Sequence, residues 1–329
     1  MEIISGKTQF QIPVKTAVAI GKFDGVHLGH RRLIEALMRK KAQGLAAAIF
    51  TFDPSPAVFF APDGYVRELS TKEEKRLLFG SIGIDYLVEF PLTWETASTE
   101  PETFVKKYLA SQMNAGHIVA GDDLSFGRGG AGNFVLLDSM SDDLGFTTEE
   151  ISKVRKNGIV ISSSYVRELV EAGRMEEAEE FLGTPYSVLG EIVHGNEIGR
   201  TLGIPTLNQV PTANKLLPPF GVYYSDVTFI KSTGDAGNDA FTRYGGTETA
   251  GRTFHGMTNI GVKPTIKKEL APGQKPAVTV ETYLYDFDDD VYGETALVKL
   301  HTFRRPEKKF DSIDELKAVM SSDIEAGRS

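Results

Sequence analysis

The sequence predicts two domains of different class: an N-terminal α/β domain with a Rossmann-like parallel sheet, and a C-terminal small antiparallel β-barrel with a terminal helix. Three observations lead to this prediction. A chain of 329 residues is long enough to bury two cores. In the first half, apolar runs alternate with helical patterns, whereas in the second half apolar residues recur with period two. We therefore expect domains over residues 1–183 and 184–329.

Composition narrows the class of protein. The net charge of -9 argues against general affinity for nucleic acid, so an anionic ligand must be held by local amides and a few basic side chains. The absence of cysteine excludes disulfides, thiolate zinc sites and a Cys nucleophile, and it suits a reducing cytosol. No apolar run approaches about 18 residues and the first residues lack a signal layout, so we expect a cytoplasmic protein without a membrane partner.

The first half reads as alternating strands and helices. Apolar runs predict strands at 17–20, 46–52, 86–90 and 117–120. Leu33, Ile34 and Leu37 mark one face of a helix that ends near Gly44. A capping box within residues 70–74 opens the next helix, and a third helix covers 102–109. Such alternation predicts a parallel sheet, whose ligands bind beyond the carboxyl ends of the strands.

Residues 21–30 lie between the first strand and the first helix, which is the arrangement of an anion site. Glycines let the backbone approach a ligand, and a helix N-terminus presents unpaired amides and a positive dipole end. We expect His27 and His30 to stabilise charge on phosphate oxygens there. Two ordinary surface histidines are the alternative, and a shared metal is disfavoured because no Glu-rich partner and no Cys follow. The ligand contacts predicted in this turn are Gly21, Phe23, Asp24, Gly25 and Gly29.

Two later segments belong to the same predicted edge. Residues 121–127 follow the strand at 117–120, so Asp123 could accept a ribose hydroxyl or orient a neighbour, the alternative being a solvated turn aspartate. Phe126 is placed among the predicted ligand contacts. Residues 127–132 spell a dinucleotide fingerprint, but they follow a loop and open no clear helix. We interpret them as a mobile flap whose Arg128 is free to meet phosphate.

A serine-rich helix start follows a predicted hairpin at Asn157-Gly158. Ser163 and Ser164 cap the helix and leave hydroxyls and amides facing outward, and Arg167 falls within reach of a phosphate bound there. Plain N-capping is the alternative. The helical pattern continues beyond this start and is interrupted at Gly173.

In the second half, short strands are predicted at 221–230, 252–260, 278–285 and 295–303, which favours a closed antiparallel barrel. Residues 231–251 are expected to form a long loop, and a helix begins at the capping box of Ser312 and Glu315. Before the barrel strands, residues 195–208 present glycines and then a hydroxyl and an amide on one side of an extended segment. Thr206 and Asn208 are hard oxygen ligands that suit Mg2+ bridged to nucleotide phosphates.

Glu281 lies in the middle of the strand at 278–285, on the face opposite Val278 and Val280. A carboxylate at such a position is unusual unless it is exposed or used. An outward-facing surface glutamate is the alternative interpretation, and the position alone favours that alternative.

Several segments, taken in order, resemble the bacterial bifunctional riboflavin kinase/FAD synthetase family, whose N-terminal half is an FMN adenylyltransferase. Residues 21–30 match Gly-x-Phe-Asp-Gly-Val-His-x-Gly-His. Residues 121–127 and 161–167 are similar to Gly-x-Asp-Phe-x-Phe-Gly and Ile-Ser-Ser-Thr-x-Ile-Arg, with Leu124 and Ser164 as departures. Residues 195–208 resemble Gly-x-x-x-Gly-Arg-x-Leu-Gly-Phe-Pro-Thr-Ala-Asn, with Ile204 and Leu207 as departures, and the likeness continues almost to the C-terminus.

This resemblance implies an enzyme with two ATP-using sites and with Mg2+ as cofactor. Riboflavin would be phosphorylated to FMN in the barrel, with Glu281 as the base, and FMN would be adenylylated to FAD in the α/β domain. The small-molecule partners are then ATP, riboflavin, FMN and FAD. The implied phosphate and nucleotide contacts of the kinase half are Gly195, Gly199, Arg200, Gly203, Thr206 and Asn208.

Two rival functions stay open. The chain could retain only the kinase, because Leu124, Ser164 and the glycine-rich flap depart from the family pattern. It could also be a non-catalytic flavin or nucleotide sensor, but the presence of His27 and Glu281 argues against this alternative. The sequence is silent on oligomeric state, so a homo-oligomer is left open.

Overall fold

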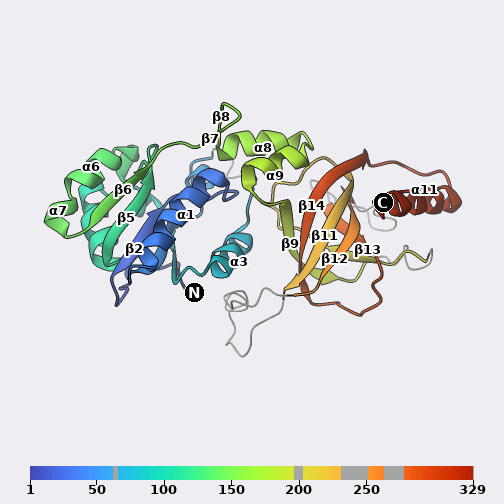
Figure 1. Cartoon of the computed structure of the whole chain (residues 1–329), viewed down its shortest axis with the longest axis horizontal. Helices are drawn as coiled ribbons and strands as arrows, with labels where there is room; N and C mark the ends of the chain where they lie inside the picture. Colours follow the sequence, from blue (N-terminus) through green and yellow to red (C-terminus); the bar gives the residue numbers. More distant parts are fainter. Residues whose placement is uncertain (62–65, 196–202, 231–250, 263–277, 329) are drawn as a thin grey trace. The chain divides into compact units, whose positions relative to one another are not determined.

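The structure, a computed structural model, describes residues 1–61, 66–195, 203–230, 251–262 and 278–328 (Figure 1). Its contacts form two compact units, which meet in the chain between Ser163 and Ser164. In this division residues 164–182 contact the second unit, although the helical pattern had assigned them to the first domain. The domain boundary after residue 183 stays a prediction.

The first unit contains a parallel sheet in the order β1-β4-β3-β2-β5-β6, which confirms the predicted Rossmann-like class (Figure 1). Its strands are β1 (Glu2–Ser5), β2 (Thr16–Ile20), β3 (Ala46–Asp53), β4 (Tyr86–Pro91), β5 (Ala115–Gly121) and β6 (Thr147–Ile151). The helices are α1 (Leu28–Lys41), α2 (Pro56–Phe59), α3 (Lys72–Ile82), α4 (Trp94–Ala97), α5 (Pro101–Thr103), η1 (Phe104–Gln112), η2 (Arg128–Gly130), α6 (Phe134–Ser139) and α7 (Ser141–Leu144). The predicted hairpin is β7 (Arg155–Lys156) and β8 (Ile159–Val160).

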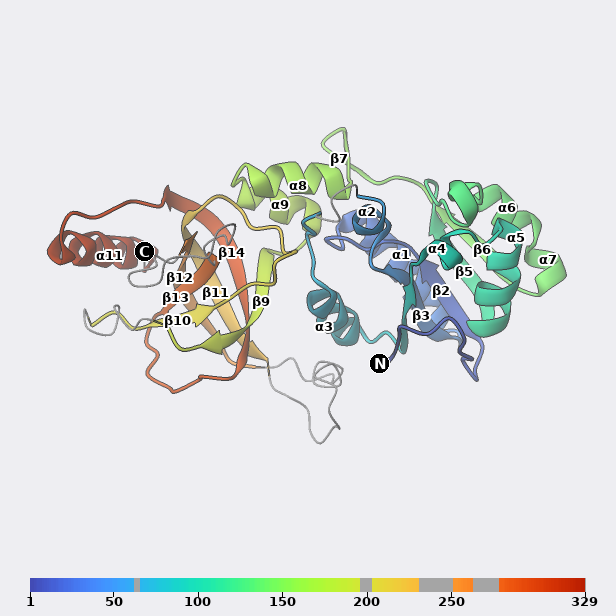
Figure 2. The same ribbon diagram turned by 180° about the vertical axis from the view of Figure 1, so that it is seen from behind.

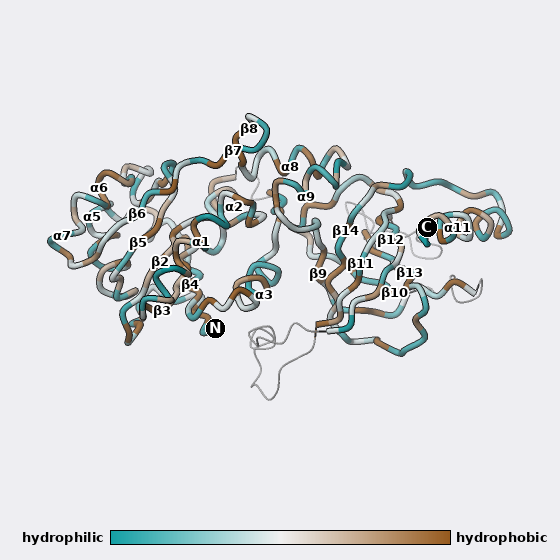
Figure 3. The backbone as a smooth tube through the Cα atoms, viewed as in Figure 1, coloured by the Kyte–Doolittle hydropathy of each residue, from teal (hydrophilic) through white to brown (hydrophobic). Residues whose placement is uncertain are grey.

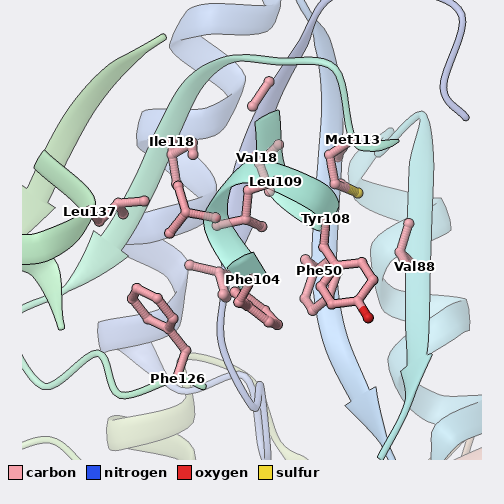
Figure 4. Close-up of a cluster of buried hydrophobic side chains, with 14 of the residues drawn as sticks. Val18, Phe50, Val88, Phe104, Tyr108, Leu109, Met113, Ile118, Phe126 and Leu137 are labelled. Atoms are coloured by element: carbon pink, nitrogen blue, oxygen red, sulfur yellow. The ribbon is translucent and has the colours of Figure 1, made fainter. Parts of the chain in front are cut away.

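Helices cover both faces of this sheet because β2 and β3 are apolar on both sides. Leu33 and Leu37 of α1 pack with Ala19 and Ile49 on one face. On the other face, η1 and α6 pack against side chains such as Phe50 (Figure 4). The carboxyl edge of the sheet therefore rests on strands that are fixed from two sides.

Two features of this unit differ from the sequence analysis. The helix expected at 102–109 begins as α5 and continues as the π-helix η1 to Gln112. Strands β1 and β6 were not predicted. Their residues are half-buried or exposed, so these edge strands lack the apolar runs that marked the central ones.

The second unit contains a closed antiparallel barrel, as predicted; Figures 1 and 2 show it from opposite sides. The order of its strands is β10-β13-β12-β11-β14-β9, of which β9 and β10 were not predicted. Its strands are β9 (Tyr186–Val193), β10 (Thr206–Gln209), β11 (Gly221–Ile230), β12 (Thr253–Val262), β13 (Val278–Leu284) and β14 (Thr295–Pro306). The helices are α8 (Ser163–Glu171), α9 (Met175–Leu182) and α11 (Ile313–Gly327), and α8 and α9 are separated at Gly173, as expected.

Buried and half-buried positions alternate along β14 from Thr295 to His301, and the buried ones, Ala296, Val298 and Leu300, fill the barrel; Figure 3 shows the hydropathy of the barrel strands. The side chain of Ser312 caps α11 as predicted, but the carboxylate of Glu315 accepts from the Asp311 amide instead of closing the capping box. The expected loop at 231–251 lies outside the described residues except for Gly251. No helix in the described ranges is long and apolar enough to cross a membrane.

Candidate active sites

The first candidate site lies where β2 passes into α1. His27 is the N-cap of α1, and its Nδ1 accepts a hydrogen bond from the His30 amide at 3.4 Å. The two imidazoles stack with ring centroids 3.9 Å apart and planes 15° apart. A Cβ on Gly29 would lie 3.1 Å from the His27 ring, so the glycine leaves room for this ring at the start of the helix. The predicted histidine pair is therefore one compact group at a helix N-terminus.

The turn that carries the pair is conformationally demanding. Phe23 and Val26 have φ angles of 52° and 39°, in the left-handed region that costs a non-glycine residue about 1–3 kcal/mol. Asp24 helps to hold the turn, because its carboxylate accepts from the Ser70 amide at 3.1 Å and its carbonyl accepts from Ser163 Oγ at 2.8 Å. Strain of this kind, fixed by surrounding bonds, is a feature of functional turns.

Both imidazoles favour the neutral form. Burial lowers the pKa of His27 to about 4, against the opposing effects of a backbone hydrogen bond and of the Asp123 charge. Burial also lowers the pKa of His30, and the neighbouring His27 and Lys75 lower it further. Neutral rings can donate a hydrogen bond to phosphate, and a bound polyanion would raise both pKa values.

This protonation state predicts an acid-sensitive fold. The unfolded His27 imidazole takes up a proton near pH 6.5 and the folded one only near pH 4, so stability is complete above pH 6.5 and is lost between these values. His27 alone should remove about 3 kcal/mol from the free energy of unfolding over that window. Urea unfolding followed by the fluorescence of Trp94, the single tryptophan, measures this. His27→Asn keeps a capping side chain, and its pH dependence should be shallower; equal slopes would contradict the assignment.

The segment after β5 packs against other residues of the first unit. Asp123 is exposed and lies 3.8 Å from the Lys153 ammonium. Phe126, a predicted ligand contact, is 3 % exposed and packs on Phe104 with ring centroids 5.3 Å apart (Figure 4), so the structure gives it a core position. Arg128, expected to be free for phosphate, forms an exposed ion pair with Glu100 at 3.0 Å, and its amide donates to the Thr99 carbonyl.

The serine-rich segment begins α8, as predicted. The bond from Ser163 Oγ to the Asp24 carbonyl connects this residue to the turn of the histidine pair. Ser164 and Arg167 lie in the first turns of α8, which belong to the second unit. Their predicted contact with phosphate stays a prediction.

The second candidate site lies on the outer face of the barrel. Asn208 of β10 and Asn259 of β12 are the direct neighbours of Glu281 across the sheet, and Thr206 pairs with Tyr283. Opposite side chains in an antiparallel pair lie about 5 Å apart at Cβ, so Glu281 stands between two amides. Glu281 is half-buried and accepts a bond of 3.4 Å from Thr279 Oγ1. It is therefore neither isolated nor fully solvated.

Asn208 is 6 % exposed, and its Nδ2 donates to the Thr206 carbonyl at 3.2 Å. Within the described part of the chain no donor reaches its amide oxygen, which leaves that atom for a ligand. Gly203 has a φ of +75°, a left-handed conformation that favours glycine. The predicted contacts Gly199 and Arg200 lie outside the described residues.

Gly195 leaves room for the Asn208 side chain. A Cβ at this position would overlap with three Asn208 side-chain atoms, whereas a Cβ on Gly190 of β9 would meet its nearest neighbour at 3.4 Å. We expect Gly195→Ala to displace Asn208 and to lower at least tenfold the kcat/KM of the riboflavin phosphorylation that the sequence resemblance implies. Gly190→Ala is the matched control and should stay near wild type. Steady-state assays of both variants check this, and an unaffected Gly195→Ala would remove Asn208 from the site.

A pocket beside Thr206 and Asn208 contains residues to which the sequence analysis gave no role. Its lining consists of Pro205, Thr206, Leu207, Asn208, Leu284, Phe287, Asp288, Asp289, Asp290, Val291 and Tyr292. Glu281 is not among them, although it neighbours Asn208 in the sheet. The run of three aspartates was a signal in the sequence, but acidic runs usually mark solvated loops. Tyr292 also stacks on His194, with ring centroids 3.7 Å apart.

A group of exposed aromatic residues was also missed. Phe60 and Trp94 are 56 % and 72 % exposed, and both contact Phe59 with ring centroids 4.9 Å apart. They follow the carboxyl ends of β3 and β4, the same edge of the sheet at which the histidine pair follows β2. Exposed rings at that edge offer a stacking surface for a planar ligand.

The comparisons with known proteins assign both halves. Residues 9–165 match the family model described as FAD synthetase, and residues 182–329 match the model described as riboflavin kinase. The bifunctional riboflavin kinase/FMN adenylyltransferase of Listeria monocytogenes is 33% identical over 312 residues, 94% of this chain and 90% of that protein. The chain belongs to this family.

Another member of the bifunctional riboflavin kinase/FMN adenylyltransferase family is equally similar. The one from Bacillus subtilis is 33% identical over 315 residues, 94% of this chain and 90% of that protein. A crystal structure named as a macrolide-efflux protein from Streptococcus pneumoniae is 28% identical with a TM-score of 0.78, and it covers 100% of this chain and 99% of that one. In this family member, the histidine pair lies in the part that matches FAD synthetase, and Glu281 lies in the part that matches riboflavin kinase.

Proposed function

We propose that the chain phosphorylates riboflavin to FMN in the barrel and adenylylates FMN to FAD in the α/β unit. The observation that carries this function is the match of the two halves to two different family models, each containing one of the two candidate sites. The sites are chemically unlike, with an imidazole pair at a helix N-terminus in one and a carboxylate between two amides in the other. Two sites of different chemistry suit two different transfers at phosphorus.

In the kinase reaction, Glu281 is the proposed general base. Its carboxylate takes the proton of the riboflavin 5'-hydroxyl as that oxygen attacks the γ-phosphorus of ATP, and the bond to ADP breaks. Thr279 supports this role because its hydroxyl holds one carboxylate oxygen. Positioning by the rigid sheet supplies the rest of the acceleration.

Thr206 and Asn208 are the proposed holders of Mg2+. They fit the ion because both offer neutral oxygens on one side of β10, and because no donor in the described ranges occupies the Asn208 amide oxygen. When bound, Mg2+ supplies neutralisation of phosphate charge. Asn208 itself is oriented by its own bond to the Thr206 carbonyl.

In the adenylyltransferase reaction, a phosphate oxygen of FMN attacks the α-phosphorus of ATP and pyrophosphate leaves. His27 and His30 donate hydrogen bonds to the phosphate oxygens on which charge develops, and the amides at the start of α1 add to this. Asp123 raises the affinity of His27 for a proton, which helps the ring to carry charge when phosphate is bound. The aromatic group of Phe59, Phe60 and Trp94 supports stacking of the flavin at the same edge.

Product analysis tests this function. Chromatography of a reaction with riboflavin, ATP and Mg2+ should show FMN followed by FAD, and a reaction that starts from FMN should yield FAD and pyrophosphate. FMN without FAD would leave the chain a kinase alone, as the departures at Leu124 and Ser164 allow. The absence of both products would favour a sensor.

A further inference from the structure

Lys75 is a largely buried lysine whose role the packing of the first unit does not explain. This lysine lies on α3 and is 8 % exposed. Within the residues that the structure describes, its ammonium makes neither a hydrogen bond nor an ion pair. Its neighbours on the helix differ, because the Glu74 carboxylate accepts from the Thr71 amide and Arg76 binds Glu89. The side chain is mostly enclosed by the protein, but its Nζ atom keeps access to solvent, so the ammonium is open to a ligand.

The surroundings of Lys75 point to that ligand. Phe79, one turn further along α3, packs edge-on against Phe23 at 5.6 Å, and Phe23 lies 5.1 Å from the His30 ring. This face of α3 is therefore directed at the histidine pair. The His30 Nδ1 atom is itself buried without a partner in the described ranges. The charge of Lys75 is close enough to contribute to the low pKa of His30.

We propose that Lys75 binds a phosphate oxygen of ATP at the histidine pair and neutralises charge on the departing pyrophosphate. This role rests on the proposed adenylyl transfer and adds a residue to it that no motif identified. A polyphosphate is the ligand chemistry that fits, because it would supply acceptors at once to the Lys75 ammonium, a buried imidazole nitrogen and the first amides of α1. Lys75 is thus a catalytic residue rather than a structural one.

The test uses the full chain with Lys75→Met, which keeps the shape and removes the charge. We expect kcat/KM for FAD formation from FMN to fall about 100-fold, with the kinase activity unchanged. Lys75→Arg restores the charge and should recover most of the loss. The melting temperature of Lys75→Met should stay close to that of wild type, because within the described residues the ammonium has no hydrogen bond or ion pair to lose. Retained FAD formation together with a lower melting temperature would show a structural role and overturn the proposal.

Lys72 provides the matched control on the same helix. Its ammonium pairs with Asp53 and lies 3.3 Å from the Glu89 carboxylate, so Lys72→Met should lower the melting temperature. Calorimetric titration with inorganic pyrophosphate separates this proposal from the proposed function. Lys75→Met and His30→Ala should weaken the same pyrophosphate site about tenfold, even if wild type made no FAD. Unchanged pyrophosphate binding in Lys75→Met would overturn the proposal.

Discussion

Glu281→Gln should lose riboflavin phosphorylation by a factor of about 10²–10⁴, the usual contribution of a general base. Glutamine keeps the size of the side chain and can still accept the bond from Thr279, but it cannot take the proton of the attacking hydroxyl. Steady-state formation of FMN from riboflavin measures the loss. The kinase kcat should fall more than the affinity for riboflavin, because the interaction is made in the transition state.

Two controls accompany the Glu281→Gln variant: the other reaction of the same enzyme, and a matched glutamate variant elsewhere in the barrel. Formation of FAD from supplied FMN should stay at the wild-type rate, because that reaction is assigned to the other unit. Glu191→Gln changes an exposed glutamate on β9 of the same barrel and should leave both activities intact. A Glu281→Gln enzyme that phosphorylates riboflavin normally would remove the assigned base.

His30→Ala should reduce adenylyl transfer from FMN by about 10²–10³-fold, the usual loss when one donor to a developing charge is removed. The His30 ring stacks on His27, so the variant also loosens the second imidazole. FAD formation from FMN, followed with pyrophosphate release, measures the effect. The variant should still convert riboflavin to FMN at the wild-type rate. Equal losses in both reactions would indicate a folding defect, and unchanged FAD formation would contradict the role of the pair.

Much of the fold could be predicted, because helix ends and strand faces are determined by residues that are close together in the sequence. The capping box predicted within residues 70–74 is formed by Thr71 and Glu74, and Gly173 separates α8 from α9 with a φ of +72°. The period-two pattern of β13 places Val280 inside the barrel and Glu281 outside it. The turn at residues 21–30 could be predicted for the same reason, since strand, glycines and helix start follow one another directly.

The rest depends on partners that are distant in the sequence. Lys75 looks like any helical lysine until the packing of Phe79 on Phe23 directs its helix face at the histidine pair. The role of Phe126 could not be predicted, because a motif position does not tell whether the ring faces a ligand or Phe104. Asp290 enters the pocket beside Thr206 only through the closure of the barrel.

A complementation assay tests the central claim that the two transfers occur at separate sites. Glu281→Gln and His30→Ala are each incubated with riboflavin, ATP and Mg2+, and then mixed in one reaction. Neither variant alone should make FAD, whereas the mixture should make it, because FMN released by His30→Ala is adenylylated by Glu281→Gln. Supplied FMN should give FAD with Glu281→Gln, which shows that it accepts FMN from solution. If FMN supports that reaction but the mixture still makes no FAD from riboflavin, the assignment of one transfer to each site is contradicted.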